Sequence, residues 1–241
     1  MNTDWLQRTK ILVGEEGLLK LVNSNVLIVG LGGVGSYAAE FIVRSGIQNL
    51  TIVDGDYVDR TNRNRQLTAL LSTENQFKTD VMQRRLLDIN PELNLSVSNR
   101  FITPDDIDDL LNNKKYDYII DAIDSLSPKI SLLVAAHKKK IKVVSCMGAG
   151  AKFDPTKIKV TDISKSHHCK LAHMVRKRLH AEHRIYKGIK VVFSDEQIVK
   201  ESLRVTDGTN FKKSYYGTIS YLPAAFGGVC ASVVIKGLLE K

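Results

Sequence analysis

A glycine-rich loop and the carboxylate that follows it mark a candidate site for phosphate groups. The stretch VLIVGLGGVGS, residues 26–36, places Gly30, Gly32 and Gly35 in a G-x-G-x-x-G arrangement, which is typical of a strand–turn–helix nucleotide site. Asp54 ends the next apolar stretch, where a carboxylate is expected to bind ribose hydroxyls. The loop alone leaves open whether the ligand is a redox dinucleotide or a nucleoside triphosphate, and a tight turn without a ligand is a further alternative.

The residues after the second apolar stretch favour the triphosphate. The segment DYVDRTNRNRQ is rich in Arg and Asn, Lys78 opens the next helical pattern, and Asp124 ends a later apolar stretch. A dinucleotide pyrophosphate carries about two negative charges and a triphosphate about four. Cleavage of a triphosphate usually requires Lys, Arg and Mg²⁺, with a carboxylate to bind the metal. For Arg63 and Arg65 taken alone, ordinary surface charge is the alternative. The chain has no G-x-x-x-x-G-K-[ST] motif, so the site is not a P-loop.

The charge of the chain is distributed unevenly. Residues 1–150 hold 18 Lys and Arg against 18 Asp and Glu, whereas residues 151–241 hold 17 against 8, within a net charge of +9. Most of the excess lies between Lys152 and Lys190, where five of the six histidines also occur. A basic segment beside a neutral nucleotide half predicts a surface for a polyanion such as nucleic acid, with a solvated charged face as the alternative.

Strand and helix patterns alternate up to residue 148 and must position these side chains. They predict an α/β fold, a doubly wound, mainly parallel Rossmann-like sheet with helices on both faces. The expected strands are 25–30, 49–56, 93–101, 116–124 and 141–148, and the expected helices are 4–22, 33–46, 78–90, 103–113 and a segment ending at Lys140.

The pattern changes after Gly150. We expect a short strand at 157–163, a basic amphipathic helix at 169–183, a strand at 189–197, a polar loop at 200–216 and an apolar helix from Thr218. We therefore predict one domain over residues 1–241, with an ATP-binding half at 1–150, a basic excursion at 151–217 and an apolar C-terminal helix at 218–241. The apolar run Leu222–Ile235 is too short to span a bilayer, so a buried helix and no membrane partner are expected.

The three cysteines are too few for a disulfide framework or a cysteine-based zinc knuckle. Their scarcity and the lack of a signal-peptide pattern in the first ten residues favour a cytoplasmic location. Cys146 and Cys230 are expected to be structural. In HHCKLAH, His168, Cys169 and His173 could imitate a metal site, although histidines that face phosphate on a basic helix are the preferred interpretation.

The order of motifs GLGGVGS, TIVDGD, TNRNRQ, FK and DAIDS resembles the ThiF/MoeB/HesA superfamily of ubiquitin-activating-enzyme-like adenylyltransferases, over residues 8–150. The resemblance implies that a substrate carboxylate and the α-phosphate of ATP form an acyl-adenylate with release of pyrophosphate. The implied catalytic residues are Arg65, Lys78, Asp124, which would position Mg²⁺, and Arg8, which would enter the neighbouring subunit of a homodimer. The implied ATP-binding residues are Gly30, Gly32, Gly33, Gly35, Asp54, Asp56, Asn62, Arg65, Gln66, Lys78, Asp121 and Ser125.

Later motifs are similar to one branch of this superfamily, the tRNA threonylcarbamoyladenosine dehydratases (TcdA/CsdL-like). The motifs are DAIDSLSPK, SCMGAGAKFDPTKIKVTDISKS, LAHMVRKRL, VVFSDE and GTISYLPAAFGGVCASVVI. The branch implies a tRNA that carries N6-threonylcarbamoyladenosine at position 37, next to the anticodon, whose threonyl carboxylate is adenylated and then closes into a ring with net dehydration. The expected tRNA-binding residues are Lys165, Arg176, Lys177 and Arg178. The stretch at Cys169–Lys170 departs from the Asp-Pro usual in the branch, which puts the local loop geometry in doubt.

Other functions remain open from the sequence. An adenylyltransferase that activates the C-terminus of a ubiquitin-like sulfur-carrier protein is the main alternative, although such enzymes usually carry two CxxC zinc pairs, which this chain lacks. A non-catalytic nucleotide sensor or scaffold and a dehydrogenase are further alternatives. A monovalent cation near ATP and a cysteine desulfurase or sulfur-acceptor partner are also left open.

Overall fold

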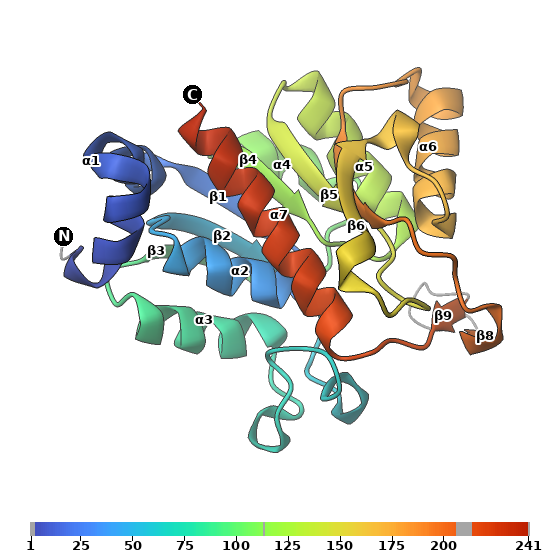
Figure 1. The fold of residues 1–241 in the computed structure, drawn as a ribbon, viewed down its shortest axis with the longest axis horizontal. Helices are drawn as coiled ribbons and strands as arrows, with labels where there is room; N and C mark the ends of the chain where they lie inside the picture. Colours follow the sequence, from blue (N-terminus) through green and yellow to red (C-terminus); the bar gives the residue numbers. More distant parts are fainter. Residues whose placement is uncertain (1–2, 113, 206–213, 241) are drawn as a thin grey trace.

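The computed structural model describes residues 3–112, 114–205 and 214–240, and it contains a central seven-stranded sheet (Figure 1). The strand order is β3-β2-β1-β4-β5-β7-β6, and all neighbouring strands are parallel except β6 and β7. The strands are β1 (Asn25–Val29), β2 (Asn49–Val53), β3 (Asn94–Ser98), β4 (Tyr118–Asp121), β5 (Lys142–Cys146), β6 (Ile158–Asp162) and β7 (Lys190–Ser194). The predicted doubly wound α/β fold is confirmed.

Helices cover both faces of the sheet (Figure 1). The first face carries α1 (Gln7–Asn23), α2 (Gly35–Arg44), α3 (Lys78–Ile89) and α7 (Tyr221–Leu239), and the second carries α4 (Asp106–Asn112), α5 (Leu126–Lys138) and α6 (Lys170–His183). The central strands are apolar on both sides because both faces are covered, as is usual in parallel sheets. The amphipathic stripe predicted for 169–183 is present, since Ala172, Val175 and Leu179 of α6 are buried in the second core.

The apolar helix α7 packs on α2, β4 and β5. By length and composition alone it could cross a membrane, but 56% of its most apolar window is buried within the structure. Its first turn reaches the glycine loop, because a Cβ added to Gly33 would lie 2.9 Å from Pro223 Cβ. Farther along, a Cβ on Gly227 would lie 2.6 Å from the carbonyl oxygen of Val34, so only glycine lets the two helices approach this closely.

Short elements lie in the segments that connect the main strands and helices. The 57–75 segment includes two 3₁₀ turns, η2 (Arg60–Asn62) and η3 (Leu71–Thr73). Around the expected loop at 200–216, η6 (Lys200–Ser202) precedes β8 (Leu203–Val205), which pairs antiparallel with β9 (Ser214–Tyr216). Two more 3₁₀ turns, η4 (Pro155–Lys157) and η5 (Ile163–Lys165), flank β6, and η1 (Asp4–Leu6) precedes α1.

Candidate functional site

The glycine loop joins β1 to α2 at the carboxyl edge of the sheet, next to the point where the strand order reverses between β1 and β4. Gly30 has a φ of +91°, and a Cβ there would lie 2.7 Å from the Ala122 carbonyl oxygen. A Cβ on Gly35 would lie 1.8 Å from the Gly30 oxygen. Gly32 differs, because its Cβ would meet only Gln66 Nε2, at 3.9 Å. Packing therefore requires Gly30 and Gly35, whereas Gly32 borders open space before the N-terminus of α2, as a phosphate cradle requires.

Asp54 follows β2 and ties the glycine loop to the next strand. Its Oδ2 accepts a hydrogen bond from the Leu31 amide at 2.5 Å, and its Oδ1 accepts one from the Asp56 amide at 2.8 Å. Burial raises the pKa of the Asp54 carboxyl, while the charge of Lys78 and these amides act in the opposite direction. Lys78, buried at the start of α3, donates to Asp56 Oδ2 at 2.7 Å. Three residues expected to hold ATP thus lie together.

Arg65 and Asp124 come from distant parts of the chain and meet at this edge. Burial lowers the pKa of the Arg65 guanidinium, and the nearby charge of Asp124 raises it. The side chain of Arg65 donates to the Thr61 carbonyl at 2.9 Å and to Asn64 Oδ1 at 2.8 Å, so the loop itself holds the guanidinium in place. A cation and a carboxylate are therefore close to each other, on the segments that follow β2 and β4.

Two amide side chains of the same loop play different parts. Asn62 Oδ1 accepts from the Asp59 amide at 3.3 Å and closes a capping box around η2, so it shapes the loop. Gln66 Oε1 is buried and has no hydrogen-bond partner within the described ranges. A buried acceptor without a partner is costly. The other amide atom, Nε2, is the one that a Cβ on Gly32 would meet, so a hydrogen-bond donor faces the open cradle. Together with the open cradle, this observation fits ATP, and the Asp124 carboxylate is the kind of oxygen donor that Mg²⁺ prefers.

Asp121 was expected to contact ATP directly, but the structure places it inside the protein. It is fully buried at the end of β4, where Oδ2 accepts from Lys129 Nζ at 2.7 Å and from Ser145 Oγ at 2.5 Å. Its Oδ1 accepts from the Ile123 amide at 3.1 Å. These contacts make Asp121 a positioning residue that fixes the turn between β4 and α5. The same turn carries Asp124 and Ser125, the residue at the N-cap of α5.

The buried partner Lys129 was missed by the sequence reasoning. Its side chain is 0% exposed, and a charged group is almost never buried so completely unless it is paired. A lysine within the apolar pattern LSPKISLL was the available signal, but the pattern did not reveal its partner, which lies on β4.

The four residues expected to bind tRNA divide into two pairs. Lys165 and Lys177 are exposed. Arg176 instead donates to the carbonyl and hydroxyl oxygens of Ser166, both at 2.8 Å, and holds the turn before α6. Arg178 forms a two-point ion pair with Glu182. Lys177 and Arg178 also line a groove of about 420 Å³ between the first turn of α5 and α6, with Leu126, His173, Met174, Ala181 and Glu182.

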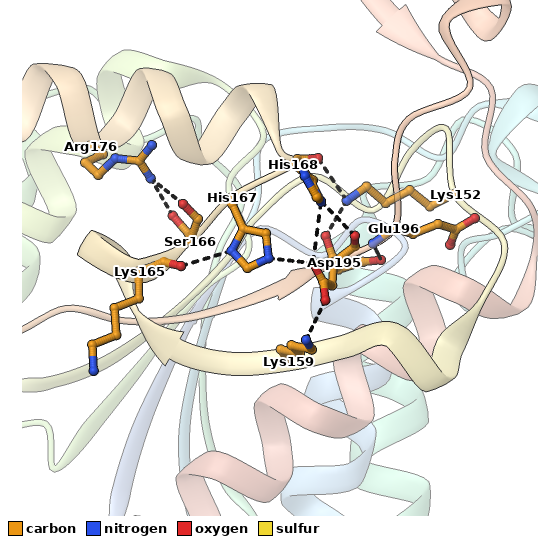
Figure 2. Close-up of polar contacts among 10 residues, drawn as sticks. Lys152, Lys159, Lys165, Ser166, His167, His168, Arg176, Asp195 and Glu196 are labelled. Carbon is orange, nitrogen blue, oxygen red and sulfur yellow. Dashed lines mark hydrogen bonds and ion pairs between the residues drawn. The ribbon is translucent and has the colours of Figure 1, made fainter.

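Within the described residues, the HHCKLAH stretch does not bring His168, Cys169 and His173 together as a metal site, the alternative that was not preferred from the sequence. The buried Cys169 Sγ accepts from the Ala172 amide at 3.5 Å and caps α6, and the exposed His173 lines the groove. His168 and its neighbour His167 turn to Asp195 instead, which follows β7 (Figure 2).

Comparison with known proteins gives the family of the chain. Residues 6–241 match the ThiF family. The chain belongs to the ThiF family. This result confirms the superfamily resemblance, and the match extends through the basic segment to α7.

ThiF-family relatives also agree with the branch. A Bacillus subtilis (strain 168) protein named tRNA threonylcarbamoyladenosine dehydratase is 40% identical over 97% of this chain and 94% of its own length. A protein of the same name from Escherichia coli (strain K12) is 36% identical over 98% of this chain and 95% of its own length. The E. coli structure of tRNA N6-threonylcarbamoyladenosine dehydratase, TcdA, in complex with ATP matches with a TM-score of 0.90, 36% identity and coverage of 99% of this chain and 95% of that chain.

The sulfur-carrier alternative has weaker support from the relatives. A Drosophila virilis protein named adenylyltransferase and sulfurtransferase MOCS3 is 33% identical, but the match covers 58% of this chain and 30% of that protein.

Proposed function

We propose that this ThiF-family protein is an ATP-dependent tRNA threonylcarbamoyladenosine dehydratase. The observation that carries the proposal is the likeness, over nearly the full length of both chains, to relatives of that name and to a structure that holds ATP. The likeness includes the basic segment 151–217, which suits a tRNA backbone and has no evident use in activating a small protein.

The reaction is an adenylation followed by a ring closure. A carboxylate oxygen of the threonyl group attacks the α-phosphorus of ATP, the bond to the β-phosphate breaks, and pyrophosphate leaves. An internal nucleophile of the same modified base then attacks the activated acyl carbon, and AMP leaves with the former carboxylate oxygen. One molecule of water is thus removed from the base. Because the nucleophile belongs to the substrate, no catalytic cysteine is needed, in keeping with the burial of all three cysteines.

The residues of the chain supply binding and charge. The backbone at Gly32 and the N-terminus of α2 cradle phosphate, and Asp54 is placed to accept from the ribose hydroxyls. Arg65 and Lys78, whose Nζ is paired with Asp56, stabilise the charge that develops on the phosphate oxygens. Mg²⁺ held by Asp124 would neutralise part of the triphosphate charge when it is bound.

The basic segment is proposed as the tRNA-binding surface, and the structure suggests which charges to change. Arg176 is a poor choice, because its replacement would release the Ser166 turn. The exposed Lys165 and Lys177 are better, so we expect K165E and K177E together to weaken binding of a tRNA anticodon stem-loop while ATP affinity is retained. The slope of log affinity against log salt should flatten by roughly 0.7–0.9 for each phosphate that the variant no longer neutralises. An unchanged slope and affinity would place tRNA elsewhere.

A homodimer is proposed on the face formed by α1, α2 and α7. Ile11, Leu12 and Leu19 of α1 are 78%, 84% and 56% exposed. They lie beside a groove of about 650 Å³, and an apolar face of this kind is typical of a protein interface. Arg8 is exposed on the same helix, which runs into the N-terminal end of β1 (Figure 1). The proposed homodimer includes insertion of Arg8 into the partner's site, so R8A mixed with D124A subunits should show complementation if the sites are shared.

The decisive experiment measures the modified nucleoside itself. The purified protein, ATP and Mg²⁺ should convert N6-threonylcarbamoyladenosine in tRNA to its cyclised form, with a mass loss of one water by nucleoside mass spectrometry. Cells that lack the protein should retain the uncyclised nucleoside. If ATP–pyrophosphate exchange responds to a carrier protein ending in Gly-Gly and not to the modified tRNA, the sulfur-carrier alternative is correct.

A further inference from the structure

Two consecutive histidines and an aspartate gather around one point outside the nucleotide site (Figure 2). His167 Nε2 lies 2.5 Å from Asp195 Oδ1, and His168 Nδ1 lies 3.5 Å from the same oxygen. One ligand atom from each residue falls within 4.8 Å of the others. In a tetrahedral site with bonds of about 2.0–2.2 Å, ligand atoms are about 3.3–3.6 Å apart. The three side chains can therefore reach this geometry with small rotations.

The hydrogen bonds of His167 show which of its ring nitrogens faces Asp195. Its Nδ1 lies 3.1 Å from the Lys165 carbonyl oxygen, which can only accept, so Nδ1 carries a hydrogen (Figure 2). The opposite atom, Nε2, then faces the carboxylate oxygen of Asp195. In the metal-free protein a proton lies between these two atoms, and a metal ion would replace that proton as the atoms move about 1 Å apart. This tautomer is also the one that offers the Nε2 lone pair to a metal.

The outer contacts are those expected around metal ligands. A histidine that binds a metal usually donates its other ring N–H to a carbonyl or carboxylate, as His167 does to Lys165. A carboxylate ligand is usually held by a hydrogen bond to its second oxygen, and Lys159 Nζ lies 2.5 Å from Asp195 Oδ2. Lys159 therefore occupies Oδ2 and leaves Oδ1 directed at the His167 ring. His168 Nδ1 lies 3.0 Å from the Asp195 carbonyl oxygen, and it would give up this contact to bind a metal beside Oδ1.

The backbone around the cluster is fixed independently of a metal. The buried Lys152 donates to the Ser194 carbonyl at 2.6 Å and to the His168 carbonyl at 3.3 Å, and so joins the end of β7 to the turn before α6. His168 has a φ of +49°, a left-handed conformation that brings two adjacent rings to one carboxylate. The site thus needs little rearrangement to bind an ion.

We propose that His167, His168 and Asp195 form a binding site for a divalent transition-metal ion, with Zn²⁺ as the best match. Two imidazoles and one carboxylate suit zinc, whereas Mg²⁺ and Ca²⁺ prefer oxygen ligands throughout. The side chains are 47%, 47% and 28% exposed, so an ion can enter from solvent and a fourth position is open to water. The ion would tie the η5–α6 turn to the end of β7.

Metal titration of the full chain tests the proposal. Purified, metal-free protein is titrated with Zn²⁺ by calorimetry and with Co²⁺ by visible spectroscopy. We expect one ion per chain with nitrogen and oxygen ligands, seen as Co²⁺ bands without the near-ultraviolet absorption of a thiolate ligand. H167A, H168A and D195N should each lower the affinity by at least about tenfold. H173A is the matched control, because His173 is exposed on α6 outside the cluster and should leave the affinity unchanged.

Several results would overturn the site. The wild-type protein would fail to take up one equivalent of Zn²⁺, or H167A and H168A would both keep full affinity. Alternatively, H173A would lose as much metal affinity as the cluster variants, or thiolate absorption would indicate Cys169 as a ligand. Circular dichroism and ATP titration of each variant verify the fold and the nucleotide site separately. A failure of metal binding would leave the proposed dehydratase activity untouched, because none of the three residues is assigned to the reaction.

Discussion

Replacement of Gly32 by alanine separates the nucleotide-binding role of the glycine loop from its structural role. A Cβ at this position would have one neighbour within 4 Å, Gln66 Nε2 at 3.9 Å, and Gly32 does not adopt a positive φ. The folded chain should therefore accept alanine without strain. Because alanine restricts the unfolded chain more than glycine does, we expect the free energy of unfolding to rise by about 0.4–1 kcal/mol.

The same methyl group should strongly impair ATP binding. It would stand in the open space where a phosphate oxygen approaches the loop amides. Loss of one hydrogen bond to a charged group costs about 1.5–3 kcal/mol. We therefore expect the Kd for ATP to rise roughly 10- to 150-fold in G32A, since each 1.4 kcal/mol corresponds to a factor of ten. Calorimetric titration with ATP and Mg²⁺ measures the affinity, and urea unfolding measures the stability.

Two further glycines serve as controls. In G35A the added Cβ would lie 1.8 Å from the Gly30 carbonyl oxygen, so we expect a loss of stability of at least about 1–3 kcal/mol. In G217A the nearest atom to the new Cβ is Ser202 Cβ at 3.5 Å, so stability should rise by a similar amount as in G32A while ATP affinity stays near wild type. If G32A binds ATP within threefold of wild type, the phosphates do not lie against Gly32 and the assigned orientation of ATP is wrong.

The remaining predictions concern the turn after β4 and the core. D124A should lose ATP–pyrophosphate exchange while its circular dichroism spectrum is retained, and full exchange would remove Asp124 from the mechanism. K129M leaves the buried Asp121 without its cation and should lower the unfolding free energy by about 3–5 kcal/mol in chemical denaturation, an effect that K129R should partly avoid. Burial raises the pKa of Tyr118 to about 12, so between pH 10 and pH 12 the unfolded state ionises first and stability falls. Y118F should lack this alkaline component, so its stability relative to wild type should be constant below about pH 9 and increase above it; a constant difference throughout would contradict the assignment.

The fold could be predicted because its signals are local. Continuous apolar strands, amphipathic helices and glycines at the turns alternate along the sequence as they do in a doubly wound sheet. The carboxyl ends of the parallel strands in such a sheet lie at one edge. Asp54 and Asp124 could therefore be placed near the glycine loop without a structure. The segments β8 and β9 escaped prediction because each has only three residues, too few for an alternating pattern to be visible.

Side-chain direction and long-range pairing could not be predicted in the same way. Arg176 was grouped with Lys177 by sequence, but the helix turns it towards the Ser166 carbonyl and hydroxyl oxygens, where its charge serves the fold. Asp121 looked like a ligand-binding carboxylate because its partner Lys129 is contributed by the next helix. The meeting of His167 with Asp195 depends on how the turn before α6 lies over the end of β7, which no local pattern in either segment records.

The contact between α7 and the glycine loop has a consequence for the order in which the chain acquires ATP affinity. A ribosome makes Gly33 nearly two hundred residues before Pro223, the residue that packs against it. Until α7 is made and docks, the side of α2 that it covers in the folded protein stays exposed. The affinity for ATP would therefore appear late, when α7 docks. ATP binding would then indicate that folding is complete and would not assist the assembly of the early strands.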